Sequence, residues 1–127
     1  MKVTDMTDQT LDRCCILVVE DEYYLADELA LELADNGATV LGPVPNVCDA
    51  LALIDRHSPD GAILDVNLGG EPAFPLADML IGRGVPLVFT TGYDREAMPE
   101  RFAHVPRCEK PVNVAGVARA LCEAIHA

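Results

Sequence analysis

Five polar side chains are of types suited to metal and phosphate chemistry, and each ends or directly follows a short apolar run. They are the carboxylates of Glu20, Asp21 and Asp65, the hydroxyl of Thr91 and the ammonium of Lys110. Apolar runs of about four to eight residues that end in a polar group are typical of buried parallel strands. In an open α/β sheet these strand ends meet at one edge, where ligands bind. We therefore expect the five side chains to converge on one site.

Three carboxylates at one site need a positive partner, because like charges this close cannot all stay ionised. A hard divalent cation with oxygen ligands meets that need, and Mg²⁺ fits best since it keeps several waters and uses few protein oxygens. Such a site could accept a phosphoryl group. Asp65 would be the nucleophile, Lys110 would pair with the phosphoryl oxygens, and Thr91 would hydrogen-bond one of them.

The elements that must position these side chains alternate between strands and helices. Apolar periodicity predicts strands at 14–19, 39–44, 61–65, 87–90 and 105–109, and helices at 22–36, 46–57, 74–83 and 113–126. A further helix at 94–103 is expected to be short and weak, because Pro99 interrupts it. Pro43 places the second strand at a sheet edge. In the second helix the apolar face is expected to contain Val47, Ala50, Leu51 and Ile54.

Length and composition limit both architecture and partners. The chain has 127 residues, enough for one domain, which we place at 14–127 after a flexible polar arm at 1–13. The formal net charge of −12 argues against direct binding to nucleic acids and anionic membranes. The sequence contains neither a signal-peptide pattern nor an apolar run near the ~18 residues of a membrane span. Its five cysteines form no CxxC pair, so we expect small apolar thiols in a reduced, cytoplasmic protein.

The motifs at 18–22, 65, 91–92 and 110–111 resemble, in order and spacing, the receiver domain of two-component response regulators. The resemblance covers residues 14–127. It implies a flavodoxin-like (βα)5 three-layer sandwich with a parallel five-stranded sheet of order 2-1-3-4-5. It also implies that the protein is a signalling receiver and not an enzyme. A receiver catalyses only its own phosphorylation and dephosphorylation.

The same resemblance assigns roles to individual residues. Asp65 would take a phosphoryl group from the phosphohistidine of a histidine kinase. Thr91 would be the switch hydroxyl whose inward movement changes partner binding. Lys110 would be the essential base, and its bond to Pro111 would be a cis peptide.

A metal site for Mg²⁺ is also implied by the resemblance. Asp21 would be a direct ligand beside Asp65, and Glu20 would act through a water molecule. Asn67 would supply its backbone carbonyl.

The segments 65–71, 75–78 and 86–93 resemble more closely the receivers with an FATGY motif, which are usually paired with HWE or related histidine kinases in alphaproteobacteria. Thr90 stands where that motif has Ala. Arg107 stands where most receivers have an aromatic residue, which turns inward behind the threonine when the domain is phosphorylated. Tyr93 is therefore a candidate to replace that aromatic residue in signalling the phosphorylated state.

Several alternatives remain at this stage. Taken alone, Asp65 could be an ordinary turn residue and Lys110 a surface base. We expect a stand-alone receiver, with a receiver half of a longer protein as the alternative. It could act as a phosphate sink, pass its phosphoryl group to a histidine phosphotransfer protein, or switch a downstream partner. A pseudo-receiver would keep the fold as a constitutive interaction module. A flavodoxin-like cofactor binder is disfavoured, because the acids after the first strand would repel a phosphate lacking Mg²⁺.

Overall fold

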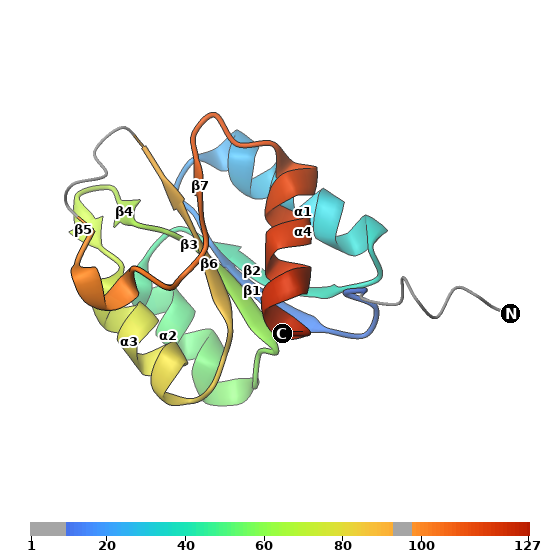
Figure 1. Cartoon of the computed structure of the whole chain (residues 1–127), viewed down its shortest axis with the longest axis horizontal. Coiled ribbons are helices and arrows are strands. Elements are labelled where there is room, and N and C mark those ends of the chain that lie inside the picture. Colours follow the sequence, from blue (N-terminus) through green and yellow to red (C-terminus); the bar gives the residue numbers. More distant parts are fainter. Residues whose placement is uncertain (1–9, 93–97) are drawn as a thin grey trace, which may run out of the picture.

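A five-stranded parallel sheet forms the centre of the protein in the computed structural model, which describes residues 10–92 and 98–127 (Figure 1). The strand order is β2-β1-β3-β6-β7. Counting the parallel strands alone, this is the predicted order 2-1-3-4-5. The strands are β1 (Cys15–Val19), β2 (Thr39–Val44), β3 (Gly61–Asp65), β6 (Leu87–Thr91) and β7 (Arg107–Glu109).

Helices cover both faces of this sheet. Figure 1 shows α1 and α4 on one face and α2 and α3 on the other. The helices are α1 (Tyr23–Asp35), α2 (Val47–Arg56), α3 (Phe74–Gly82) and α4 (Val114–Ile125). The three-layer sandwich expected from the alternation of strands and helices is therefore confirmed.

Successive strand residues point to opposite faces and build one core on each side of the sheet. In β1, Leu17 and Val19 join the core beneath α2 and α3, whereas Ile16 and Val18 join the core beneath α1 and α4. All four are fully buried. Because β1 is covered on both faces, its sequence is a continuous apolar run rather than an alternating one.

Side chains at the helix ends fix where two of the helices begin. The Asn46 side chain accepts a hydrogen bond from the Asp49 N–H (2.7 Å) at the start of α2. The Asn113 side chain likewise accepts a hydrogen bond from the Gly116 N–H (3.0 Å) at the start of α4. α1 ends at Asp35 with Asn36 as its C-cap, one residue before the predicted end, and Gly37 follows with a φ of 88°.

The structure differs from the expected apolar face of α2. Leu51 is 37% exposed, so its predicted inward position is wrong. The helix presents the face centred on Ala50 and Ile54, both buried, to the sheet. Leu53, which lies on the other side of that face, packs against the core instead.

A short hairpin between β3 and α3 was not expected from the sequence. Its strands are β4 (Asn67–Leu68) and β5 (Glu71–Pro72), which pair antiparallel. Gly69 and Gly70 make the turn with φ angles of 64° and 97°, a region that favours glycine. Strands of two residues are too short to show an alternation of apolar and polar residues in the sequence.

The weak helix expected at 94–103 is described only in its second part, because residues 94–97 lie outside the described residues. That part contains a 3₁₀ turn at Glu100–Phe102. Phe102 is buried, and its ring stacks on the ring of Phe74 in α3 at 5.4 Å between centroids. The turn is therefore anchored to α3.

The expected arm at 1–13 falls only partly within the described residues, which begin at Thr10. Leu11 is 2% exposed and packs in the core beneath α1 and α4, so the packed structure reaches back to this residue. Within the described residues, none of the helices has the length and apolar character required to cross a lipid bilayer.

Candidate functional site

The structure brings the candidate side chains together at the carboxyl edge of the sheet. Glu20 follows β1, Asp65 ends β3, Thr91 ends β6 and Lys110 follows β7. The Lys110 N–H donates to the Thr91 carbonyl (2.7 Å), which holds these two strand ends side by side. A pocket of about 860 Å³ opens here. Its lining includes Asp21, Glu22, Asp65, Asn67, Thr91 and Lys110.

Asp65 is fixed through both of its carboxylate oxygens. Oδ1 accepts a hydrogen bond from the N–H of Asn67 at 3.0 Å, so the hairpin after β3 orients the side chain. Oδ2 lies 2.6 Å from Nζ of Lys110. The residue is 3% exposed and still lines the pocket, which makes it a positioned and accessible carboxylate.

Glu20 is an equally buried carboxyl group with a strongly perturbed pKa. Its Oε2 accepts from the N–H of Glu22 (3.0 Å), and its Oε1 accepts from the hydroxyl of Thr90 (3.4 Å). Burial and the neighbouring Asp65 raise the pKa of Glu20 to about 8, although the Glu22 N–H and Lys110 act in the opposite direction. Burial and Asp65 therefore favour the protonated form of Glu20.

Lys110 supplies the positive charge of the site and is shared by three carboxylates. Its Nζ lies 2.6 Å from Asp65 and from Glu22, and 3.3 Å from Glu20. Partial burial lowers the pKa of Lys110, but the hydrogen bonds to Asp65 and Glu22 outweigh this and hold it above its ordinary value. The Glu22 contact was missed in the sequence analysis, where only the position of Glu22 beside Asp21 could have suggested it.

The carboxylates of Glu20, Asp21 and Asp65 form a donor set that fits a hard cation. Each residue offers one oxygen, and these oxygens all lie within 4.8 Å of one another. Asp21 is exposed, so a cation could keep water ligands there. Asn67 lies beside the set, with its N–H on Asp65 and its side-chain oxygen accepting from the Gly70 N–H (2.7 Å). The ligand role of its backbone carbonyl stays a prediction.

Thr91 carries a polar group that the described part of the chain leaves unsatisfied. Its Oγ1 is buried and has no hydrogen-bond partner among the described residues. A buried hydroxyl without a partner costs about 1–3 kcal/mol. Because Thr91 also lines the pocket, its hydroxyl is placed to bond a ligand oxygen there.

Three further expectations concern the surroundings of Thr91. Arg107, at the position where an aromatic residue is usual, is exposed on β7. The candidate reporter Tyr93 lies outside the described residues. The peptide bond between Lys110 and Pro111 is cis, as the resemblance implied.

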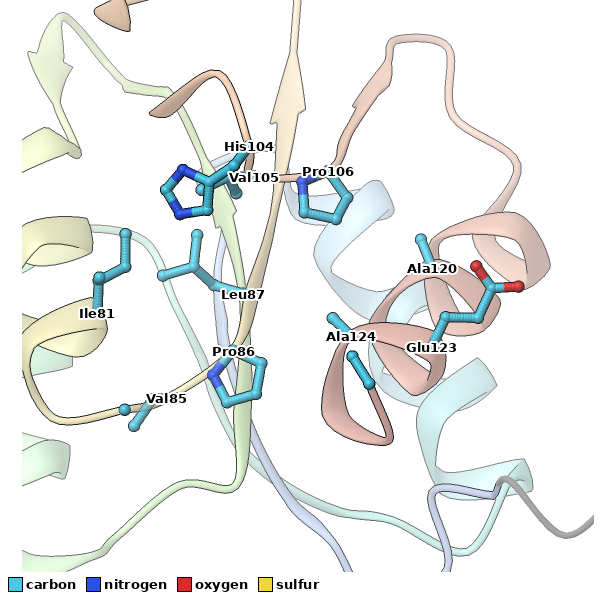
Figure 2. Close-up of a pocket in the computed structure, with 12 residues that line it drawn as sticks. Ile81, Val85, Pro86, Leu87, His104, Val105, Pro106, Ala120, Glu123 and Ala124 are labelled. Atoms are coloured by element: carbon cyan, nitrogen blue, oxygen red, sulfur yellow. The ribbon is translucent and has the colours of Figure 1, made fainter. Parts of the chain in front are cut away.

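A second pocket, which the sequence did not suggest, lies at the opposite end of β6 (Figure 2). It has a volume of about 610 Å³. In Figure 2, Pro86 and Leu87 lie between Ile81 on one side and Ala120 and Ala124 of α4 on the other. This pocket is predominantly apolar and is separated from the acidic one by the length of a strand.

Comparisons with known proteins agree with this geometry. No family model matches the sequence. The solution structure of SdrG from Sphingomonas melonis Fr1 is 40% identical, with a TM-score of 0.78 over 91% of this chain and 98% of that chain. An uncharacterised response regulatory protein of Vibrio cholerae is 33% identical over 84 residues, which is 65% of this chain and 35% of that protein.

A third similarity concerns the fold alone. The receiver domain of the PhyR response regulator from Erythrobacter litoralis has a TM-score of 0.80 at 20% identity, over 91% of this chain and 92% of that one. Several curated relatives are much longer than the region of similarity. The matched region spans 35–36% of their length.

Proposed function

This chain belongs to the receiver domains of response regulators, and from that premise we propose that Asp65 accepts a phosphoryl group from the phosphohistidine of a histidine kinase. One observation carries the proposal. Asp65 lies buried against Lys110, beside two more carboxyl groups and a Thr91 hydroxyl that has no partner among the described residues. These groups can orient a phosphoryl group and neutralise its charge, which is most of what phosphoryl transfer requires.

In the transfer step, a carboxylate oxygen of Asp65 forms a bond to phosphorus as the bond from phosphorus to the histidine nitrogen breaks. The electron pair of the broken bond stays on the imidazole, which takes up a proton. Lys110, already 2.6 Å from Asp65, moves with the negative charge from the carboxylate to the phosphoryl oxygens. The Thr91 hydroxyl donates to one of those oxygens and so gains the partner it lacks.

The donor set of Glu20, Asp21 and Asp65, with the backbone carbonyl of Asn67, would hold Mg²⁺, which supplies positive charge to the phosphoryl oxygens when bound. Glu20 fits the role of a ligand that acts through water, since burial and Asp65 raise its pKa to about 8 and so disfavour its charged form.

The identity of the kinase and of the downstream partner is a finer part of the proposal. The FATGY-like segment at 86–93 supports an HWE-type kinase, although Thr90 replaces the usual Ala. The phosphorylated domain would act in the cytoplasm on a histidine phosphotransfer protein or another partner. A pseudo-receiver is not favoured, because Asp65, Lys110 and the acid set are all in place.

Intact-mass spectrometry after incubation with Mg²⁺ and phosphoramidate tests the proposal. We expect a gain of one phosphoryl group that requires Mg²⁺ and disappears in Asp65→Asn. The matched control is Asp55→Asn, on the exposed face of α2, which should gain the group normally. A phosphoryl group that persists in Asp65→Asn, or no gain in a chain that demonstrably binds Mg²⁺, would contradict the proposal.

A further inference from the structure

The apolar pocket exists because β7 is shorter than its neighbour. β7 pairs with β6 only opposite Phe89 to Thr91, so Leu87 at the start of β6 has no strand partner on that side among the described residues. The chain leading into β7 passes nearby, where the Pro106 carbonyl accepts from the Phe89 N–H (2.9 Å). On the α4 side of the pocket, Ala120 and Ala124 line the space with small side chains, and Glu123 lies beside them. A short strand and small side chains together leave room for a large apolar group.

The lining favours an apolar group that carries positive charge beside it. Glu123 is the one carboxylate side chain among the lining residues that the structure describes, and none of them is Lys or Arg. α4 ends at this pocket without a basic residue in its last turn, so the negative end of its dipole adds to Glu123. Ile81 is 37% exposed at the rim and widens the apolar surface available to an incoming side chain.

Two other occupants fit the pocket less well. A second copy of this chain would bring a formal net charge of −12 against an equal charge. An added β-strand would have to pair along Pro86 and Pro106, which lack N–H groups. The surface is therefore suited to an inserted side chain from a basic partner rather than to self-association or strand addition.

We propose that this pocket docks a partner-protein segment that inserts one large apolar side chain flanked by Lys or Arg. The volume of about 610 Å³ lies within the range of ligand sites and exceeds the needs of one side chain, so part of the partner backbone would also be covered. Because the acidic pocket lies at the other end of the sheet, both surfaces can be occupied at once. The inference does not depend on phosphorylation of Asp65.

The test is an NMR titration of the ¹⁵N-labelled chain with three probe peptides. The first is acetyl-Lys-Leu-Lys-amide, the second replaces both Lys by Glu, and the third replaces Leu by Gly. We expect the first peptide to shift the amides of Leu87, Val105 and Ala124 in a saturable way. The third peptide, which lacks the apolar side chain, should bind more than about tenfold more weakly than the first. Reversing the charges should weaken it by about fivefold or more.

Two variants, each with a matched control, test whether the shifts arise from binding in the pocket. Ala124→Leu fills it and should abolish the response, whereas Ala52→Leu, at an exposed position of α2, should not. Glu123→Gln leaves the packing intact and should remove most of the preference for the Lys peptide. Asp55→Asn is the matched control for that charge and should keep the preference.

Several outcomes would overturn the proposal. They are equal binding of the Glu and Lys peptides, shifts centred on Asp65 and Lys110, and a response that survives Ala124→Leu. The absence of any saturable shift up to about 10 mM peptide would do the same. A concentration-dependent dimer, seen by sedimentation and lost in Ala124→Leu, would replace the basic partner with a second copy of the chain.

Discussion

The two ends of β6 show how one parallel sheet separates two kinds of surface. At its carboxyl end the strand delivers Thr91 to a pocket that contains Asp65 and Lys110. At its amino end Pro86 and Leu87 border a pocket that is mostly apolar. All strands of a parallel sheet end at the same edge, so the polar groups that follow them gather there. The opposite edge holds the ends of α3 and α4, where small and apolar residues leave unfilled volume.

The two pockets are therefore incomplete in different ways. At the acidic pocket, Glu20 has a raised pKa, Lys110 is shared by three carboxyl groups and the Thr91 hydroxyl has no partner among the described residues. Its groups are suited to a cation and to an acceptor oxygen. The other pocket has apolar walls and room for an apolar side chain. Changes of charge should consequently act on the first, and changes of side-chain size on the second.

The largest effect expected from a change of charge is that of Lys110→Ala. Phosphorylation of Asp65 should slow by at least about 100-fold, because the charge that follows the phosphoryl oxygens is lost. Mg²⁺ affinity should rise, because the cation no longer competes with the Lys110 ammonium for the carboxylates. Intact-mass kinetics and isothermal titration calorimetry measure the two effects, and Lys110→Arg is the variant that keeps the charge. A Lys110→Ala chain phosphorylated at the normal rate would contradict the role of Lys110.

The raised pKa of Glu20 predicts a pH dependence of metal binding. Mg²⁺ affinity should increase as the pH rises towards about 8, by up to about tenfold per unit, because binding displaces the Glu20 proton. Calorimetry in buffers of different ionisation enthalpy measures that proton release. Glu20→Gln should show a flat profile over the same range. A flat profile in the unmodified chain would show that Glu20 is already ionised.

The same group sets a stability trend with the opposite sign. The folded-state pKa of Glu20 lies above its ordinary value of 4.5, so the folded chain binds the proton more tightly than the unfolded chain. Its contribution to the free energy of unfolding is complete below pH 4.5 and is lost as the pH rises to about 8. Urea titrations without metal should show this decline. Saturating Mg²⁺ should reduce it, and Glu20→Gln should remove it.

A smaller contrast is expected between two adjacent threonines. Thr90→Ala removes a hydrogen bond to Glu20 and should lower the free energy of unfolding by about 1 kcal/mol. Thr91→Ala removes a hydroxyl without a partner and should leave that free energy unchanged or slightly raised. Urea titration of both variants measures the difference, with the Ser variants as controls. Equal losses would mean that Thr91 already has a partner in solution.

Glu22→Gln should have the smallest effect. The Glu22 carboxylate is 59% exposed, and ion pairs at such positions contribute at most about 1 kcal/mol. Lys110 keeps Asp65 and Glu20 as partners, so the phosphorylation rate should change by less than about fivefold. Intact-mass kinetics measures this rate. A much larger change would place Glu22 among the residues essential for transfer.

The fold and the positions of the site residues could be predicted from the sequence because each depends on a local pattern. A continuous apolar run that ends in Asp65 and two glycines is itself the strand and the turn that expose the acid. Thr91 and Lys110 follow similar runs, and strand direction alone brings their ends together. These patterns needed no information about side-chain conformation.

Other features depend on contacts between distant segments and have no local signal. The shared position of Lys110 between Glu22 and Asp65 depends on a side chain that reaches from the end of β7, past β6, to groups at the ends of β3 and β1. The exposure of Leu51 depends on how α2 is rotated on the sheet. The apolar pocket results from a strand, β7, that is shorter than the one predicted at 105–109, together with the small side chains of α4.

The most direct test of the central claim is chemical trapping of the phosphorylated residue. The chain is phosphorylated with phosphoramidate and Mg²⁺, reduced with borohydride, which converts an aspartyl phosphate to homoserine, and analysed by peptide mass spectrometry. The account predicts homoserine at position 65 and at no other aspartate, including Asp21. Homoserine at Asp21, or a phosphoryl group that resists borohydride and remains on another residue, would contradict it.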